Sequence, residues 1–302
     1  MDDYRKYFDP QTLAKLTGLD LKARLIVEGY LTGLHKSPYS GFSVEFAEHR
    51  EYAPGDDVRY VDWKVFGKTD RFYLKRFEEE TNFACHILLD ASESMAYRSP
   101  GAAVSKLEYA EYVAAALAHL VIRQQDAVGF ATFNNSVTRF LSPSSQPSHL
   151  KQLVHLMEQT VAGGETALGP IFHDLAERIR KRGLVIILSD LFEDVGTLLS
   201  GLKHFRHRRH DVSVMQVIDP AEQDFPFEDP TRFLGLEGLP EQSAEPRSLR
   251  RAYQAEFERF LRQVRGICGD MQMDYVLLRT DRPLDAALRH FLTRRMQRAG
   301  RT

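Results

Sequence analysis

One carboxylate and two hydroxyl side chains stand at alternate positions directly after an apolar run. They are Asp90, Ser92 and Ser94, and the run is Cys-His-Ile-Leu-Leu at 85–89. Such a run is typical of a buried strand in a parallel sheet. In open α/β sheets, ligands bind in the crevice beyond the carboxyl ends of the strands. Three oxygen donors at that place suit a cation such as Mg²⁺. The same residues could instead cap the turn into the next helix.

Two further oxygen-bearing side chains follow later in the chain. Asp190 directly follows a second apolar run, 184–189, and Thr166 lies in a loop that begins Gly163-Gly164 and leads into a helix. In a doubly wound sheet these loops rise at the same edge. Two ionised carboxylates balance a divalent cation, and a site without His or Cys is not one that zinc prefers. The sequence therefore predicts a site for Mg²⁺ or Mn²⁺ made of Asp90, Ser92, Ser94, Thr166 and Asp190.

From residue 85 onward, apolar runs alternate with helical patterns. This alternation predicts an α/β domain with a doubly wound, mostly parallel, Rossmann-like sheet. The further strands are expected at 126–133, 136–141, 184–190, 212–218 and 275–278, the second of them antiparallel at an edge. Helices are expected at 106–125, from the Gly163-Gly164 turn to 180, and at 148–159, 195–207, 248–266 and 283–298. A Pro- and Phe-rich stretch at 225–238 is expected to form a hairpin, inside an insertion near 221–247.

The first eighty residues have a different character. Residues 10–32 carry apolar positions at helical spacing and predict one helix. Residues 33–82 are rich in turn formers and short apolar stretches, which predicts a small β-rich segment packed on the sheet domain. We therefore expect an N-terminal segment at 1–82 and an α/β domain at 83–302.

Composition excludes several classes of function. A net charge of −2 over 302 residues argues against electrostatic binding to nucleic acid. Cys85 and Cys268 form no disulfide framework and no zinc spacing, which fits a reducing compartment. The N-terminus lacks the apolar core of a signal peptide, and the most apolar helical stretch, 113–122, is too short to cross a bilayer. We expect a cytoplasmic protein without direct membrane insertion. His35, His49 and His173 have no sequence partner that suggests a ligand set.

The five oxygen donors resemble the metal-ion-dependent adhesion site of von Willebrand factor A domains. The preceding segment resembles the DUF58 family, closely over residues 33–95. The residues that carry this resemblance are Gly41, Glu45-Phe46, Arg50-Glu51-Tyr52, Pro54-Gly55-Asp56-Asp57, Arg59, Asp62-Trp63-Lys64, Phe77-Glu78 and Leu89 to Met95. Gly67-Lys68 departs from the resemblance, because Ala-Arg is expected there.

The resemblance implies an adaptor and not an enzyme. A domains complete the metal's open position with a carboxylate from a partner, and DUF58 proteins resemble components of bacterial systems built around MoxR-type AAA+ ATPases. The expected partner is such an ATPase, a client protein, or both. Two alternatives stay open. Asp90 could be the nucleophile of a metal-dependent hydrolase or phosphatase, although Ser92 stands where the general acid is needed. The two carboxylates could also only hydrogen-bond to the loops of a metal-free scaffold.

Overall fold

The computed structural model describes residues 8–35, 50–51, 73–74, 84–236, 238 and 240–299. Contacts divide the chain into two compact units, residues 1–33 with 84–302, and residues 34–83. In the second unit, β1 (Arg50–Glu51) pairs antiparallel with β2 (Tyr73–Leu74). The β-rich packing expected for residues 33–82, the Pro54-Gly55 turn and Gly67-Lys68 lie outside the described residues.

The larger unit is built on a six-stranded sheet with the order β10-β7-β6-β3-β4-β5. All neighbours pair in parallel except β4 and β5. The strands are β3 (Ala84–Asp90), β4 (Ala127–Phe133), β5 (Val137–Ser144), β6 (Leu184–Ser189), β7 (Asp211–Ile218) and β10 (Asp274–Arg279). The chain builds one side from β3 to β5 and then the other from β6 to β10. The order therefore reverses between β3 and β6, the switch point at which doubly wound sheets bind ligands.

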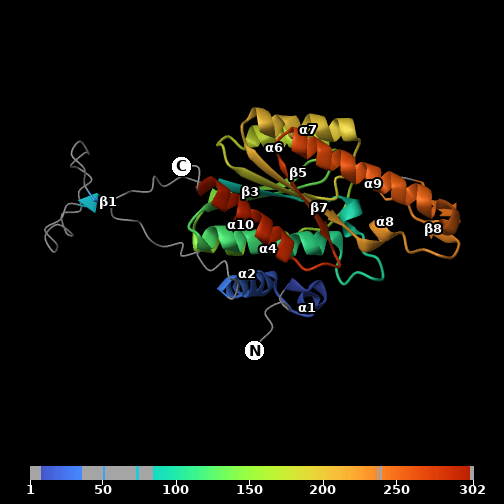
Figure 1. Ribbon diagram of the computed structural model, residues 1–302, viewed down its shortest axis with the longest axis horizontal. Coiled ribbons are helices and arrows are strands. Elements are labelled where there is room, and N and C mark those ends of the chain that lie inside the picture. Colours follow the sequence, from blue (N-terminus) through green and yellow to red (C-terminus); the bar gives the residue numbers. More distant parts are fainter. Residues whose placement is uncertain are drawn as a thin grey trace. The chain divides into compact units, whose positions relative to one another are not determined.

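Helices cover both faces of this sheet (Figure 1). On one face lie α6 (Leu168–Arg178), α7 (Val195–His207) and α9 (Pro246–Asp270). On the other lie α4 (Lys106–Arg123) and α10 (Asp285–Ala299), with α5 (Pro147–Glu158) packed beside α4. The predicted α/β class and mostly parallel sheet are confirmed. Among the described residues, no helix has the length and apolar character needed to cross a membrane.

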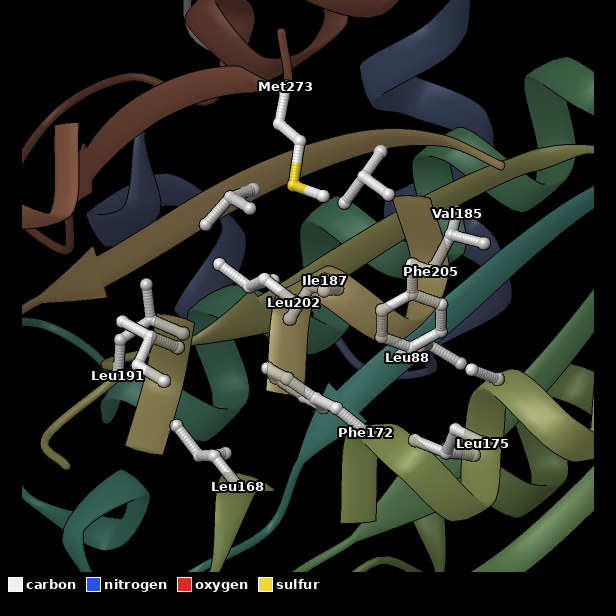
Figure 2. Close-up of a cluster of buried hydrophobic side chains, with 14 of the residues drawn as sticks. Leu88, Leu168, Phe172, Leu175, Val185, Ile187, Leu191, Leu202, Phe205 and Met273 are labelled. Atoms are coloured by element: carbon white, nitrogen blue, oxygen red, sulfur yellow. The ribbon is translucent and has the colours of Figure 1, made fainter. Parts of the chain in front are cut away.

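One hydrophobic core joins the sheet to α6, α7 and α9. Figure 2 shows Leu88 of β3 and Ile187 of β6 beside Phe172 of α6 and Phe205 of α7. The ring of Phe172 meets that of Phe205 edge-on, with centres 5.6 Å apart. Burying each such side chain contributes roughly 1.5–3 kcal/mol. The core fixes α6 and α7. The loop before α6 carries Thr166, and the loop before α7 carries Asp190.

The helix α4 crosses the other face of the sheet and contacts β3, β4, β6 and β7. Its start is fixed by a capping box, in which Ser105 Oγ accepts from the Glu108 amide and Glu108 accepts from the Ser105 amide. A run of small residues, Ala114 to Ala116, is wholly buried. Small side chains let the helix lie close against the strands. Its first residue, Lys106, reaches Asp190 at the carboxyl edge of the sheet.

The single N-terminal helix expected at 10–32 was wrong. The structure has α1 (Pro10–Ala14) and α2 (Leu19–His35), separated at Gly18, whose φ of +80° is left-handed and suits glycine. Lys22 of α2 donates a 2.8 Å hydrogen bond to the Tyr112 hydroxyl of α4. The first helices therefore group with the α/β domain, whereas the sequence division at 82/83 assigns them to the N-terminal segment.

The insertion after β7 contains a short helix and a hairpin. It comprises α8 (Pro220–Asp224) and the antiparallel pair β8 (Thr231–Phe233) and β9 (Gln242–Ala244). Phe225 packs against Phe227, Phe233 and Tyr253 with ring centres 4.4–5.7 Å apart. These aromatic contacts hold the insertion together; the expected hairpin is present, but its second strand lies beyond the predicted 225–238.

Gly183 provides a test of the packing at the start of β6. A Cβ there would lie 2.3 Å from the carbonyl oxygen of Ala84, a backbone atom that cannot rotate away. We expect Gly183→Ala to lower the free energy of unfolding by at least 1–3 kcal/mol. Gly266→Ala in α9 is the matched control, because its Cβ would meet nothing within 4 Å. It should raise that free energy by about 0.5–1 kcal/mol. Urea unfolding measures the free energy of both variants. Equal changes in the two would contradict the close packing at Gly183.

Candidate functional site

The two predicted carboxylates meet at the switch point of the sheet. Asp90 is the last residue of β3, and Asp190 follows the last residue of β6. The two strands are parallel neighbours, with Leu89 opposite Leu188. Asp90 is 0% exposed and Asp190 1%. Two acids thus lie beside each other, buried, at the carboxyl edge.

Each oxygen of Asp90 accepts a hydrogen bond. The backbone amide of Ser92 donates to Oδ1 at 2.9 Å, and the Ser189 hydroxyl donates to Oδ2 at 2.5 Å. Burial and the negative charge of Asp190 nevertheless raise the pKa of Asp90 to about 7. The Oγ atoms of Ser92 and Ser94 are 3.1 Å apart. Carboxylate and hydroxyl oxygens therefore gather at the end of β3, where the ionised form of Asp90 is disfavoured.

The loop that carries Thr166 is fastened across the Asp90 loop. The amide of Gly163 donates to the carbonyl of Ala91 at 2.8 Å, and the amide of Glu93 donates to the carbonyl of Gly164 at 3.0 Å. Gly164 has a φ of +81°, so the turn needs a residue without a Cβ. Thr166 follows two residues later and is half-buried. The structure thus brings all three predicted loops to one edge, with Thr166 placed there by its backbone.

Lys106 is a site residue that sequence reasoning missed. Its ammonium is fully buried and lies 2.7 Å from Asp190 Oδ2 and 2.6 Å from Glu222 Oε1 of α8. It also lies 4.7 Å from the centre of the Phe192 ring. Burial by itself would lower the pKa of Lys106, but the two carboxylates outweigh it and raise that pKa. A sequence signal did exist: a cation at the first turn of a helix opposes the helix dipole, so it needs acids nearby.

The Asp190 loop is held in one conformation by contacts that the sequence does not reveal. Leu191 has a φ of +59°, an uncommon conformation for a residue with a Cβ, and its amide donates to Ser189 Oγ at 2.9 Å. The Phe192 amide donates to Asp190 Oδ1 at 3.2 Å, and Gln216 donates to the Asp190 carbonyl at 2.8 Å. Such strain persists only where the surroundings enforce it, and it is common at functional sites.

The donor set fits a hard divalent cation. When all are ionised, Asp90, Asp190 and Glu222 against Lys106 leave two uncompensated negative charges. Each carboxylate oxygen can accept more than one hydrogen bond. No group of three His, Cys, Asp or Glu side chains gathers as metal ligands anywhere in the described residues. Serine and threonine hydroxyls would therefore have to complete the set, and Mg²⁺ and Mn²⁺ accept such ligands.

Comparison with known proteins places this chain in a family. Residues 48–262 match the family described as "Protein of unknown function DUF58", which is more than half of the chain. The chain belongs to the DUF58 family. The uncharacterized proteins Rv1480 of Mycobacterium tuberculosis and Mb1516 of Mycobacterium bovis are each 27% identical to this DUF58 protein over 225 residues. The match covers 72% of this chain and 68% of theirs.

Solved structures with low sequence identity also match the DUF58 chain. BatB from Bacteroides thetaiotaomicron is 17% identical, with a TM-score of 0.49 over 73% of this chain and 100% of that one. A protein described as an aerotolerance-related membrane protein from Bacteroides fragilis is 18% identical, with a TM-score of 0.44 over 68% and 94%. The SpRpn10 VWA domain is 17% identical, with a TM-score of 0.34 over 45% and 75%.

Proposed function

We propose that this DUF58 protein is a non-enzymatic, metal-dependent protein-interaction module. The observation that carries the proposal is the pair of buried carboxylates at the switch point, with serine hydroxyls beside them. The pKa of Asp90 is raised to about 7 by burial and by Asp190, so a cation would relieve the charge that the pair accumulates. The doubly wound fold supports the proposal because it presents this edge to ligands.

The residues that would hold Mg²⁺ or Mn²⁺ are Asp90, Ser92, Ser94, Thr166 and Asp190. When bound, the ion would supply a Lewis-acidic position for a carboxylate of a partner protein. The chain's own contribution is to orient the oxygens. Ser189 and the Ser92 amide fix the Asp90 carboxylate, and Lys106 and the Phe192 amide fix that of Asp190.

A hydrolase that uses Asp90 as nucleophile is less well supported. Asp90 is fully buried, and each of its oxygens already accepts a hydrogen bond from the chain. Ser92 occupies the position where such enzymes carry a general acid. The metal-free scaffold is the stronger alternative. In a scaffold Asp90 would only accept hydrogen bonds, and the structure contains such bonds from the Ser92 amide and the Ser189 hydroxyl. The metal response of the protein separates the scaffold from the module.

The first test measures thermal unfolding with and without Mg²⁺ or Mn²⁺. At about 100 times its Kd a ligand adds about 2.7 kcal/mol to the free energy of unfolding. For a domain of this size we expect Tm to rise by roughly 5–10 °C. Asp90→Ala should abolish the rise. Asp194→Ala is the control, because Asp194 caps α7 nearby and is exposed; it should lower Tm and keep the rise. If neither metal changes the Tm of the wild type, the proposal fails and the metal-free scaffold is the remaining interpretation.

The partner is proposed from the family resemblance. DUF58 proteins resemble components that work with MoxR-type AAA+ ATPases to assemble or activate client complexes, and we propose this role in the cytoplasm. We expect the immobilised protein to retain the MoxR-type ATPase of its own organism, or a client, in Mg²⁺. EDTA and Asp90→Ala should each release it, whereas Asp194→Ala should not. Retention that both treatments leave unchanged would show that the metal is not the contact.

A further inference from the structure

The helices α6 and α7 approach each other closely because glycines meet where they cross. A Cβ on Gly201 would lie 3.2 Å from the Cα of Gly169 and 3.1 Å from a ring carbon of Phe172. Neither position tolerates a larger side chain without movement. With the backbones this close, side chains one turn away can reach from one helix to the other.

Two histidines occupy those positions. His173 lies one turn after Gly169, and His204 lies three residues after Gly201. Their Nδ1 atoms are 3.2 Å apart, and the ring centres are separated by 4.4 Å. Two nitrogen ligands bound to one tetrahedral Zn²⁺ at about 2.0–2.1 Å are separated by roughly 3.3 Å. The two rings are hydrogen-bonded to each other, and the same spacing fits two ligands of one metal ion.

An acidic side chain lies near the pair, and it is already paired with Arg208. Glu177 lies one turn beyond His173, and its pKa is lowered by a hydrogen bond from Arg208 and by both histidines. Burial, His173 and His207 lower the pKa of His204. His173 is exposed and His204 half-buried, so an ion can enter from solvent.

We propose that His173 and His204 together bind a divalent transition cation such as Zn²⁺, linking α6 to α7. Imidazole nitrogens suit Zn²⁺, Cu²⁺ and Ni²⁺ and not Mg²⁺. Since no third His, Cys, Asp or Glu joins them as a ligand in the part of the chain that is described, water completes the coordination. The link joins the two helices that follow the Thr166 and Asp190 loops, but its ligands are not those of the proposed Mg²⁺ site.

The test is Zn²⁺ titration by calorimetry at pH 7.5, on the full chain without a histidine tag. Millimolar Mg²⁺ is present to occupy the oxygen site. We expect one Zn²⁺ per chain, with at least tenfold weaker binding in His173→Ala and in His204→Ala. His155→Ala is the matched control, because His155 lies on α5 and bonds only its neighbour Gln159 in the described structure. It should bind Zn²⁺ as wild type does, and so should Asp90→Ala.

His204→Gln guards against a folding defect, because the amide can still hydrogen-bond to His173 but is a poor zinc ligand. It should keep the zinc-free Tm of the wild type and lose the binding. Wild-type Zn²⁺ affinity in both alanine variants, or no Zn²⁺ uptake by the wild type, would overturn the proposal. A Zn²⁺ site lost with Asp90→Ala alone would also overturn it, since the ion would then occupy the oxygen site.

Discussion

Lys106→Met should unfold this DUF58 protein far more easily in the absence of metal. Methionine fills a similar volume, but it leaves Asp190 and Glu222 buried without their counter-charge. Removing one partner of a buried ion pair costs about 3–5 kcal/mol. For a domain of this size the loss corresponds to a fall in Tm of roughly 10 °C. Urea unfolding in EDTA measures the free energy directly.

Lys22→Met is the matched control for the lysine. Lys22 also contacts α4, through Tyr112, but it is partly exposed and should cost less than about 1 kcal/mol. Adding Glu222→Gln to Lys106→Met should recover part of the loss, because one unpaired acid is removed. Mg²⁺ should raise the Tm of Lys106→Met more than that of the wild type, since the ion supplies the missing positive charge. If Lys106→Met lowers the free energy of unfolding by no more than Lys22→Met does, Lys106 is not the counter-charge that Asp190 and Glu222 need.

Asp90→Asn should stabilise the metal-free protein as the pH rises. The pKa of Asp90 is about 7 in the folded chain, against an ordinary value of 3.8. An acid with a raised pKa contributes stability that is fully present below pH 4 and is lost as the pH rises to 7. At 1.36 kcal/mol per pKa unit, the loss reaches about 4 kcal/mol. The advantage of Asp90→Asn over the wild type should therefore grow across this window, and the variant should not respond to Mg²⁺.

Glu111→Gln separates the effect of charge from the effect of metal. Burial raises the pKa of Glu111 on α4 to about 8, with Glu108 and Glu158 adding to the shift. Its glutamine variant should also gain stability between pH 4.5 and 8, yet keep the wild-type response to Mg²⁺. Unfolding in EDTA and in Mg²⁺ at several pH values provides both comparisons. An undiminished Mg²⁺ response in Asp90→Asn would exclude the carboxylate as a metal ligand.

The strands of the parallel sheet were predictable, because buried parallel strands form continuous apolar runs in the sequence. Both 85–89 and 184–189 are nearly pure apolar runs, and each is followed directly by an acid. A parallel sheet brings such ends to one edge, so the meeting of Asp90 and Asp190 required no knowledge of side-chain contacts. The hairpin after β7 was also expected from its Pro- and Phe-rich composition. Helix ends were not predictable in the same way, because Gly18 splits a helix whose apolar spacing is continuous along the sequence.

What the sequence determined by itself is the α/β class, the two acids at the switch point and the family. Only the tertiary structure decided which charges meet them. Lys106, Asp190 and Glu222 are separated by up to 116 positions along the chain, and no local pattern links them. The same is true of His173 and His204, which meet because Gly169 and Gly201 let two helices touch. Local patterns record which side chains are buried, whereas a pairing between buried groups depends on how whole elements pack.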